Sequence, residues 1–253
     1  MPTRIIHCPC GARIESQDDG TLAATIRAHN QSAHPKFDLN DAQMAKIVEA
    51  TMRSAPWDGT TAVAENVEVV ALTPDRAGAF LAFFDRDAFS DNPGWASCYC
   101  FFYNFPGSDA EWQARRSDEN RGDKEASIRS GAARGYLAYA DGAPAAWCNA
   151  TPRTELAGLD RYPAFHTDDS DRVGAIVCFN VAPQFRRQGI AAKLLDAACD
   201  GFRAQGLAFA EAYPAKAANS DARAYHGPIQ MYLNAGFEQI REDGNFAVVR
   251  KPL

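Results

Sequence analysis

Two arginines and a glycine lie where an expected strand is followed by an expected helix. Residues 173–181 are rich in branched and aromatic residues, and residues 189–202 repeat their apolar side chains at helical spacing. The first turn of a helix has backbone N–H groups without partners and carries partial positive charge. Arg186 and Arg187 can add charge-assisted hydrogen bonds, and Gly189 lets a ligand approach the backbone closely. The segment therefore predicts a site for an anion such as pyrophosphate; the alternative is an ordinary strand–loop–helix connection with surface arginines.

This loop resembles the acetyl-CoA signature of the GNAT superfamily of acetyltransferases. The signature reads Gln/Arg-x-x-Gly-x-Gly/Ala, and Arg186, Gly189 and Ala191 occupy its three fixed positions. Val181 and Pro183 are similar to the residues at the usual strand end upstream of that loop. The resemblance implies that the anion is the pyrophosphate of coenzyme A.

A second segment, residues 225–237, resembles the helix that follows in the same family. It carries Tyr232 four residues before Gly236, and it ends in Gly-Phe. Two motifs in this order and at this separation mark residues 66–253 as similar to a GNAT domain. The resemblance implies an α/β fold with a mixed sheet, the acyl-CoA N-acyltransferase fold. It also implies an enzyme that moves an acetyl group directly from acetyl-CoA to an amine.

The same resemblance indicates which residues would contact acetyl-CoA. They come from the end of the strand, the loop, the start of the helix and the tyrosine-bearing segment. They are Phe179, Asn180, Val181, Arg186, Arg187, Gln188, Gly189, Ile190, Ala191, Ala192 and Tyr225. In this family a backbone N–H on the strand before the loop commonly donates to the thioester carbonyl as its oxygen gains charge, which points to Asn180 or Val181.

Two side chains are candidates for proton transfer. The family commonly keeps its general acid at the position of Tyr232, and a phenol with an ordinary pKa of about 10 stays protonated at neutral pH. The alternative for this tyrosine is an aromatic residue that packs the core. Glu211, on an expected strand over residues 207–213, is the candidate general base. The alternative for Glu211 is a solvent-facing or salt-bridged side chain.

An aromatic and cysteine-rich segment, residues 95–105, lies where the acceptor loops of this family usually lie. Aromatic walls with few polar groups would suit a ligand pocket, and a hydrophobic core under a long loop is the alternative. Cys98, Cys100 and Cys178 have apolar surroundings in the sequence and are expected to be small buried hydrophobes. A covalent mechanism through one of these cysteines is not expected, because no histidine lies close in sequence to activate them. The charged residues 117–124, which follow, are expected to face solvent.

The N-terminal residues 1–36 are expected to form a separate small module, ββα and zinc-binding-like. The candidate zinc ligands are Cys8, Cys10, His29 and His34. Paired cysteines and histidines at such spacings form closed structural zinc sites, and a metal would stabilise so short a unit. The module resembles a family of small bacterial metal-binding proteins of unknown function, although Cys-x-Cys departs from the more usual Cys-x2-Cys. The alternative is reduced cysteines and solvated histidines on a packed helical hairpin.

Strands and helices alternate along the rest of the chain. Residues 37–63 hold one short helix and a linker. The expected elements that follow are a strand over 67–72, a helix from Pro74 to Phe84, a hairpin over 134–150 that turns at Asp141-Gly142, a loop over 151–171, and closing strands at 237–240 and 247–250. An Asp-Gly turn between two apolar runs is a strong hairpin signal.

The composition argues against some classes of function. The formal net charge is −6 and no basic cluster offsets it, so nucleic acid is not expected as the main ligand. The chain has neither a membrane-length apolar run nor a secretory signal, so we expect a cytoplasmic protein without membrane partners. The expected acceptor is a small-molecule amine, with a protein N-terminus or lysine as the alternative, and many GNAT proteins are homodimers. The rival hypothesis is a non-catalytic acyl-CoA sensor with a metal-dependent interaction module.

Overall fold

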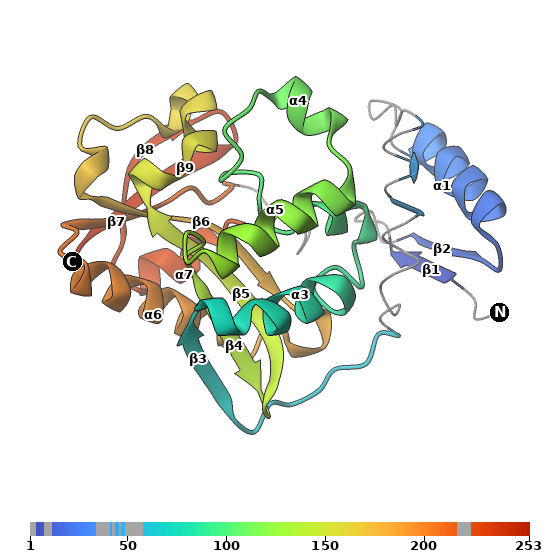
Figure 1. Ribbon diagram of the computed structural model, residues 1–253, viewed down its shortest axis with the longest axis horizontal. Coiled ribbons are helices and arrows are strands. Elements are labelled where there is room, and N and C mark those ends of the chain that lie inside the picture. Colours follow the sequence, from blue (N-terminus) through green and yellow to red (C-terminus); the bar gives the residue numbers. More distant parts are fainter. Residues whose placement is uncertain are drawn as a thin grey trace.

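A computed structural model describes residues 4–7, 12–33, 41, 44–45, 47–48, 58–216 and 224–253 of the chain. Within these residues the strands form two separate sheets (Figure 1). A two-stranded sheet belongs to the N-terminal module, and a seven-stranded sheet belongs to the part that follows. None of the described helices has the length and apolar character of a membrane span.

The larger sheet is mixed. Its strands are β3 (Val67–Ala71), β4 (Tyr136–Ala140), β5 (Ala143–Pro152), β6 (Val173–Val181), β7 (Phe209–Ala212), β8 (Glu238–Asp243) and β9 (Phe246–Pro252). In space they follow the order β3-β4-β5-β6-β7-β9-β8. Neighbours are antiparallel except β6 and β7, which run parallel because a helix connects them. The expected α/β fold with a mixed sheet is confirmed.

Helices cover both faces of this sheet. They are α3 (Ala77–Arg86), α4 (Asp109–Ala114), α5 (Ser117–Arg129), α6 (Ile190–Ala204) and α7 (Ile229–Asn234). Short 3-10 turns connect them: Pro74–Arg76, Pro93–Cys98, Arg153–Glu155, Ala157–Arg161, Pro163–Phe165, Ser170–Arg172 and Pro183–Phe185. The segment between β5 and β6, expected to be an irregular loop, is therefore built largely from 3-10 turns.

The turn between β4 and β5 also holds the start of β3 beside β4. Asp141 and Gly142 both have positive φ, 50° and 83°, as a two-residue hairpin turn requires. The Asp141 carboxylate also accepts a hydrogen bond from the backbone N–H of Asn66 at 2.9 Å. The expected hairpin is confirmed, and its turn residue fixes the chain just before β3.

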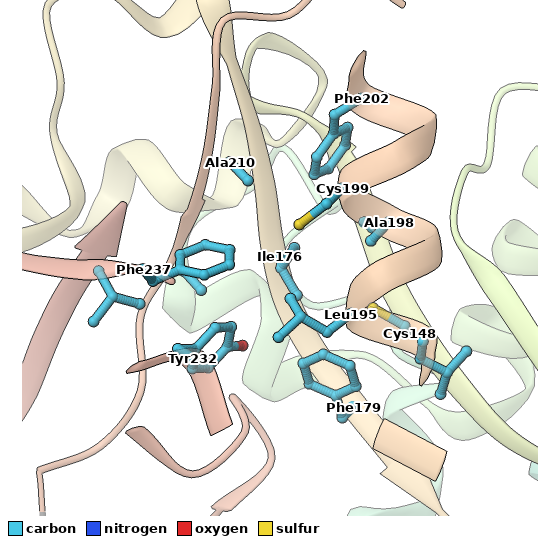
Figure 2. Packing of buried hydrophobic residues seen from close by; sticks show 14 of the residues in the cluster. Cys148, Ile176, Phe179, Leu195, Ala198, Cys199, Phe202, Ala210, Tyr232 and Phe237 are labelled. Atoms are coloured by element: carbon cyan, nitrogen blue, oxygen red, sulfur yellow. The ribbon is translucent and has the colours of Figure 1, made fainter. Parts of the chain in front are cut away.

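Successive side chains of β4, β5 and β6 point to opposite faces of the sheet. One face packs on α6 and α7 and is lined by Ala138, Ala146, Cys148, Ala150, Ile176 and Phe179. Figure 2 shows Tyr232 and Phe237 facing Leu195 and Cys199 of α6 across this face. The other face packs on α3 and α5, with Leu137 and Trp147 against the phenylalanines of α3. We call them the α6 face and the α3/α5 face.

The expectation that residues 117–124 face solvent is wrong for one side of α5. Ser117, Asn120, Lys124 and Ile128 are all buried. Their spacing of three and four residues places them on one side of the helix, so α5 turns this stripe toward the sheet. The stripe was missed because three of its four residues are polar.

The N-terminal module has the expected order of two strands and a helix. β1 (Arg4–His7) pairs antiparallel with β2 (Arg13–Ser16), and α1 (Asp19–Ala33) follows. A small apolar core unites them, made by Ile6, Ile14, Leu22, Ile26 and Met44. Met44, Ile47 and Val48 are helical, as the spacing of the next segment predicts.

Candidate active site

Strands β6 and β7 separate toward their carboxyl ends. β6 pairs with β7 only from Val173 to Ile176, whereas its pairing with β5 continues to Val181. Beyond that point the edge of β6 meets another segment, because the backbone N–H of Phe179 donates to the carbonyl oxygen of Tyr225 at 2.6 Å. Open α/β sheets bind ligands at the carboxyl ends of their strands. The candidate site therefore lies at this end of β6.

The loop after β6 brings a helix N-terminus to the same end of the sheet. Gly189 is the N-cap of α6, with a φ of 78° and no side-chain cap. This left-handed backbone conformation favours glycine. A Cβ at this position would meet nothing within 4 Å, so the space beside it is open. The first N–H groups of α6, which have no partners within the helix, are therefore accessible to an anion.

Arg186 holds the loop to the protein. Its guanidinium makes two hydrogen bonds to the Asp91 carboxylate, at 2.5 and 2.9 Å, and its Nε donates to the carbonyl oxygen of Val181 at 3.0 Å. The sequence predicted that this side chain would supply charge to a phosphate. In the structure the charge is matched by Asp91, so the guanidinium positions the loop against the strand end.

Gln188 joins the loop to the segment that leads into β3. Its Nε2 donates to the carbonyl oxygen of Ala62 at 2.5 Å, and its Oε1 accepts from the N–H of Ala64 at 3.0 Å. The N–H of Ala62 in turn donates to the carbonyl oxygen of Gln184 at 2.9 Å. The linker therefore runs along the loop and is held there by the Gln188 side chain.

The structure brings the residues expected to contact acetyl-CoA to one end of the sheet. Phe179, Asn180 and Val181 end β6, residues 186–189 form the loop, Ile190, Ala191 and Ala192 begin α6, and Tyr225 bonds to the edge of β6. The side chains of Phe179 and Ile190 pack in the core of the α6 face, so these two offer only backbone atoms to a ligand.

Tyr232 is fully buried on α7. Its hydroxyl donates to the carbonyl oxygen of His226 at 2.5 Å, and its ring packs edge-on against Phe237 (Figure 2). Burial raises the pKa of this phenol well above its ordinary value, so the hydroxyl keeps its proton. In this structure that proton is directed at a backbone carbonyl.

His226 is also fully buried, and its backbone carbonyl is the group that accepts the hydrogen bond from the Tyr232 hydroxyl. Its Nε2 lies 3.1 Å from the hydroxyl of Tyr103, whereas its Nδ1 is buried with no hydrogen-bond partner within the described residues. Burial lowers the pKa of the imidazole to about 3, so the ring is neutral at physiological pH.

Glu211 lies fully buried on β7 within an ion pair. Its Oε2 accepts from Arg250 at 2.6 and 2.9 Å, and its Oε1 accepts from the hydroxyl of Tyr213 at 2.9 Å. Arg250 also bonds to Asp169 at 2.9 Å, which joins β9 to the turn before β6. These contacts favour the salt-bridged alternative for Glu211, and its role as a general base stays a prediction.

Two buried polar atoms on the α3/α5 face have no hydrogen-bond partner within the described part of the chain. They are Nε1 of Trp147 and Oδ1 of Asn180. These residues are register partners on β5 and β6, so their side chains lie on the same face of the sheet. Burial of an unpartnered polar atom is costly, and such atoms often meet a ligand or water. The end of β6 therefore presents one donor and one acceptor on the side away from α6.

The zinc site expected in the N-terminal module stays a prediction. Of its four candidate ligands only His29 is described, on α1; Cys8, Cys10 and His34 lie outside the described residues. Among the residues that the structure describes, no group of three or more His, Cys, Asp or Glu side chains is arranged to hold a metal ion.

Comparison with known proteins agrees with this geometry. The model of the acetyltransferase (GNAT) family matches residues 96–227, just over half of the chain. The chain belongs to the GNAT family. The matched region contains β6, the loop and α6, and it ends beside Tyr225. No curated protein matches the chain.

Solved GNAT structures are similar to the chain at low identity. The PaiA N-acetyltransferase of Thermoplasma acidophilum in complex with coenzyme A has 13% identity and a TM-score of 0.44, covering 74% of this chain and 99% of its own. A GNAT acetyltransferase of Listeria monocytogenes has 13% identity and a TM-score of 0.45, covering 77% and 100%. The ribosomal-protein-alanine N-acetyltransferase of Brucella melitensis has 15% identity and a TM-score of 0.42, covering 74% and 99%. Likeness at this level carries no argument about acceptor or mechanism.

Proposed function

We propose that this GNAT protein is an acetyl-CoA-dependent N-acetyltransferase. The observation that carries the proposal is the uncapped N-terminus of α6, with Gly189 at a φ of 78°, at the end of β6 where β7 has separated. The N–H groups of residues 189–192 would bind the pyrophosphate of acetyl-CoA. The thioester would then lie along the edge of β6 just beyond Phe179. Of the two candidate donors, Asn180 and Val181, strand alternation directs the backbone N–H of Val181 toward this edge, where it can donate to the carbonyl oxygen.

In the proposed reaction the neutral amine of the acceptor attacks the thioester carbon. The C–N bond forms, the C–S bond breaks, and coenzyme A leaves as a thiolate that needs a proton while the new amide loses one. Holding the two reactants together supplies much of the rate. The unpartnered atoms of Trp147 and Asn180 support an acceptor that approaches from the α3/α5 face.

Tyr232 is the proposed source of the proton for the thiolate. Its buried hydroxyl is protonated, and transfer requires that the hydrogen bond to the carbonyl of His226 be exchanged for one to sulfur. We expect Tyr232→Phe to lower kcat about 100-fold with little change in the affinity for acetyl-CoA, since general acids contribute at least that much. Steady-state turnover with an amine library measures the rate, and calorimetry measures the affinity. Equal rates for the two proteins would exclude the tyrosine as the acid.

The loop is tested separately from the chemistry. Valine in place of Gly189 would strain a left-handed backbone position by about 1 to 2 kcal/mol, so the Kd for coenzyme A should rise about tenfold. Gly206 is a matched control, because it lies just beyond the other end of α6 with a φ of 77° and equally open space. Gly206→Val should strain the protein similarly and leave the Kd unchanged. An equal loss of affinity in both variants would count against the loop as the binding site.

A non-catalytic acyl-CoA sensor is the second candidate. The observation that favours it is the Tyr232 hydroxyl, which is fully buried and already bonded to a carbonyl. A sensor would bind coenzyme A through Gly189 and acetylate no amine. Tight binding without turnover across the library would support this function over the enzyme.

Two further expectations join the proposal. The acceptor is a small-molecule amine and the protein a homodimer, which the library and light scattering test. The N-terminal module binds zinc through Cys8, Cys10, His29 and His34. Metal analysis of the full-length protein, with Cys8→Ser/Cys10→Ser as the control, should give one zinc per chain in the parent and none in the variant. Equal metal content in both would exclude these ligands.

A further inference from the structure

A lysine and two cysteines lie together on the α3/α5 face, outside the machinery proposed above; Lys124 and Cys100 are buried and Cys178 is half-buried. Cys100 follows the turn that ends at Cys98, and Cys178 lies on β6 beside the residues of the candidate site. Lys124 is 1% exposed on the inner stripe of α5. Tyr99 and Cys100 have φ angles of 46° and 49°, two consecutive left-handed residues that are not glycine. Such backbone strain often lies at functional sites.

Asn149 joins the two cysteines geometrically. It is the register partner of Cys178 across β5 and β6, so their side chains are neighbours on one face. Its Nδ2 lies 3.6 Å from Sγ of Cys100 and 3.1 Å from Oδ1 of Asn104, and its Oδ1 accepts from Thr151 at 2.9 Å. These hydrogen bonds orient the Asn149 amide donor toward the Cys100 sulfur. Cys100 and Cys178 are therefore both neighbours of this one side chain.

Lys124 supplies the charge. Its Nζ donates to the carbonyl oxygen of Cys100 at 3.4 Å and lies 5.4 Å from the ring centres of Phe80 and Trp147. Burial lowers the pKa of the ammonium, and the groups that oppose this effect are the thiols of Cys100, Cys98 and Cys178. Within the described residues no ion pair joins it to a carboxylate. A buried cation requires an anion nearby or loses its proton. The thiol of Cys100 is the acid best placed to supply that anion.

The pKa values of the two thiols are shifted in opposite directions. Burial alone would raise the pKa of Cys100, but the hydrogen bond from Cys178, the Lys124 ammonium and the nearby side chains of Trp147 and Asn149 lower it to about 6. The hydrogen bond to Cys100 and burial raise the pKa of Cys178 well above its ordinary value. Cys100 is therefore the more acidic thiol of the pair and Cys178 the less acidic one.

We propose that Cys100 and Cys178 form an oxidisable dithiol, with Cys100 as the nucleophile and a small peroxide as its substrate. The Cys100 thiolate attacks one oxygen of hydrogen peroxide, the O–O bond breaks, and Cys100 becomes a sulfenic acid as water leaves after protonation. The thiol of Cys178 then attacks that sulfur, a second water leaves, and a disulfide joins them. Two thiols are oxidised and one peroxide is reduced to two waters.

The disulfide would bind the segment after Cys98 to β6. β6 also provides Asn180 and the edge along which the thioester is proposed to lie, so oxidation would hold the acceptor side of the site in one arrangement. This consequence for activity rests on the proposed function. The thiol chemistry does not, because it is measured on the protein alone.

Peptide mass spectrometry of the full-length protein after peroxide treatment tests the proposal. We expect a Cys100–Cys178 disulfide, lighter by two hydrogen atoms and reversed by dithiothreitol. Cys178→Ser should instead accumulate a sulfenic acid at Cys100 that dimedone traps. Lys124→Met should slow the reaction of Cys100 at pH 7 about tenfold, because the thiolate fraction falls as the pKa returns toward its ordinary value. Cys199, buried on the α6 face, gives the matched control: Cys199→Ala should leave the disulfide yield unchanged.

The outcomes distinguish the proposal from its failure and from failure of the enzyme hypothesis. A folded parent protein in which peroxide produces no Cys100–Cys178 disulfide, or pairs Cys100 with Cys98, would overturn it. Unchanged kinetics in a Lys124→Met variant with native circular dichroism would also overturn it. If the disulfide forms in a protein that acetylates no amine, the dithiol stands and the acetyltransferase proposal fails.

Discussion

The α6 face and the α3/α5 face are built by the same strands but bury different chemistry. The α6 face is apolar from Ala138 to Phe237, and its fully buried phenol, Tyr232, has its hydroxyl bonded to a carbonyl. The α3/α5 face buries Lys124 and Asn149, and it leaves polar atoms of Trp147 and Asn180 without partners among the described residues. Burial of apolar side chains stabilises the fold without requiring specific partners, whereas buried polar groups are costly unless a hydrogen-bond partner or an opposite charge pairs with them. The comparison indicates that the α6 face buries mainly apolar side chains, whereas the α3/α5 face combines an apolar cluster of its own with buried polar groups.

The largest expected effect tests the apolar face. Phe202 of α6 packs directly on Gly174 of β6, where an added Cβ would come within 2.3 Å of its ring. Phe202→Ala should lower the free energy of unfolding by about 3 to 5 kcal/mol through lost burial and a cavity. Urea denaturation measures the change. Leu233, 41% exposed on α7, is the control, and its alanine variant should change stability by less than about 1 kcal/mol. Similar losses in both would mean that the α6 face does not dominate stability.

The second prediction tests the buried His226 through the pH dependence of stability. The pKa of His226 is lowered by burial to about 3, so between that value and its ordinary one the unfolded chain binds a proton that the folded chain does not. Stability is therefore lost as the pH falls from about 6.5 toward 3, at about 1.4 kcal/mol per pH unit where the difference is complete. His226→Gln should flatten this slope in denaturation curves taken between pH 6.5 and 4.5. The control, His166→Gln, replaces a side chain that is 72% exposed and should keep the slope of the parent.

The smallest effect separates two asparagines of the α3/α5 face. Asn149→Leu would leave partners such as Asn104 and Thr151 without their hydrogen bonds, which should cost about 1 to 3 kcal/mol. Asn180→Leu removes an acceptor that has no partner, so stability should change by less than about 0.5 kcal/mol while the KM for the amine rises. Thermal unfolding and acceptor kinetics of the two variants check this. If both lose the same stability, Asn180 is a structural residue and the comparison between the faces weakens.

Local patterns predicted the parts of the molecule that depend on neighbours in sequence. The hairpin at Asp141-Gly142, the strand–loop–helix around Gly189 and the ββα order of the N-terminal module all follow from spacing and turn residues, and the structure contains each of them. The tyrosine on α7 was placed in the same way. Sequence spacing alone does not show whether this tyrosine acts as an acid.

The remaining features depend on contacts between distant segments. Lys124 lies in a charged stretch that predicts exposure, and only the packing of α5 on the sheet buries it. Cys100 and Cys178 both neighbour Asn149 of β5, although the three residues are far apart in sequence. Asp91 likewise pairs with Arg186, which lies far downstream. A local pattern carries no information about such partners, since they are set by how the elements pack. The sequence does contain one signal for the buried side of α5: its residues recur at a spacing of three and four.

The pair between Arg186 and Asp91 has a consequence for how the loop finds its ligand. With that charge already matched, Arg186 itself adds little attraction at the loop, and the oriented backbone dipoles act only near contact. Net charge acts over a Debye length of about 8 Å at physiological ionic strength, and the formal charge of the whole chain is −6. The protein therefore repels an anionic ligand in bulk solution and holds it only on arrival. Added salt should speed capture of coenzyme A by screening this repulsion, the reverse of what a site fronted by free arginines would show.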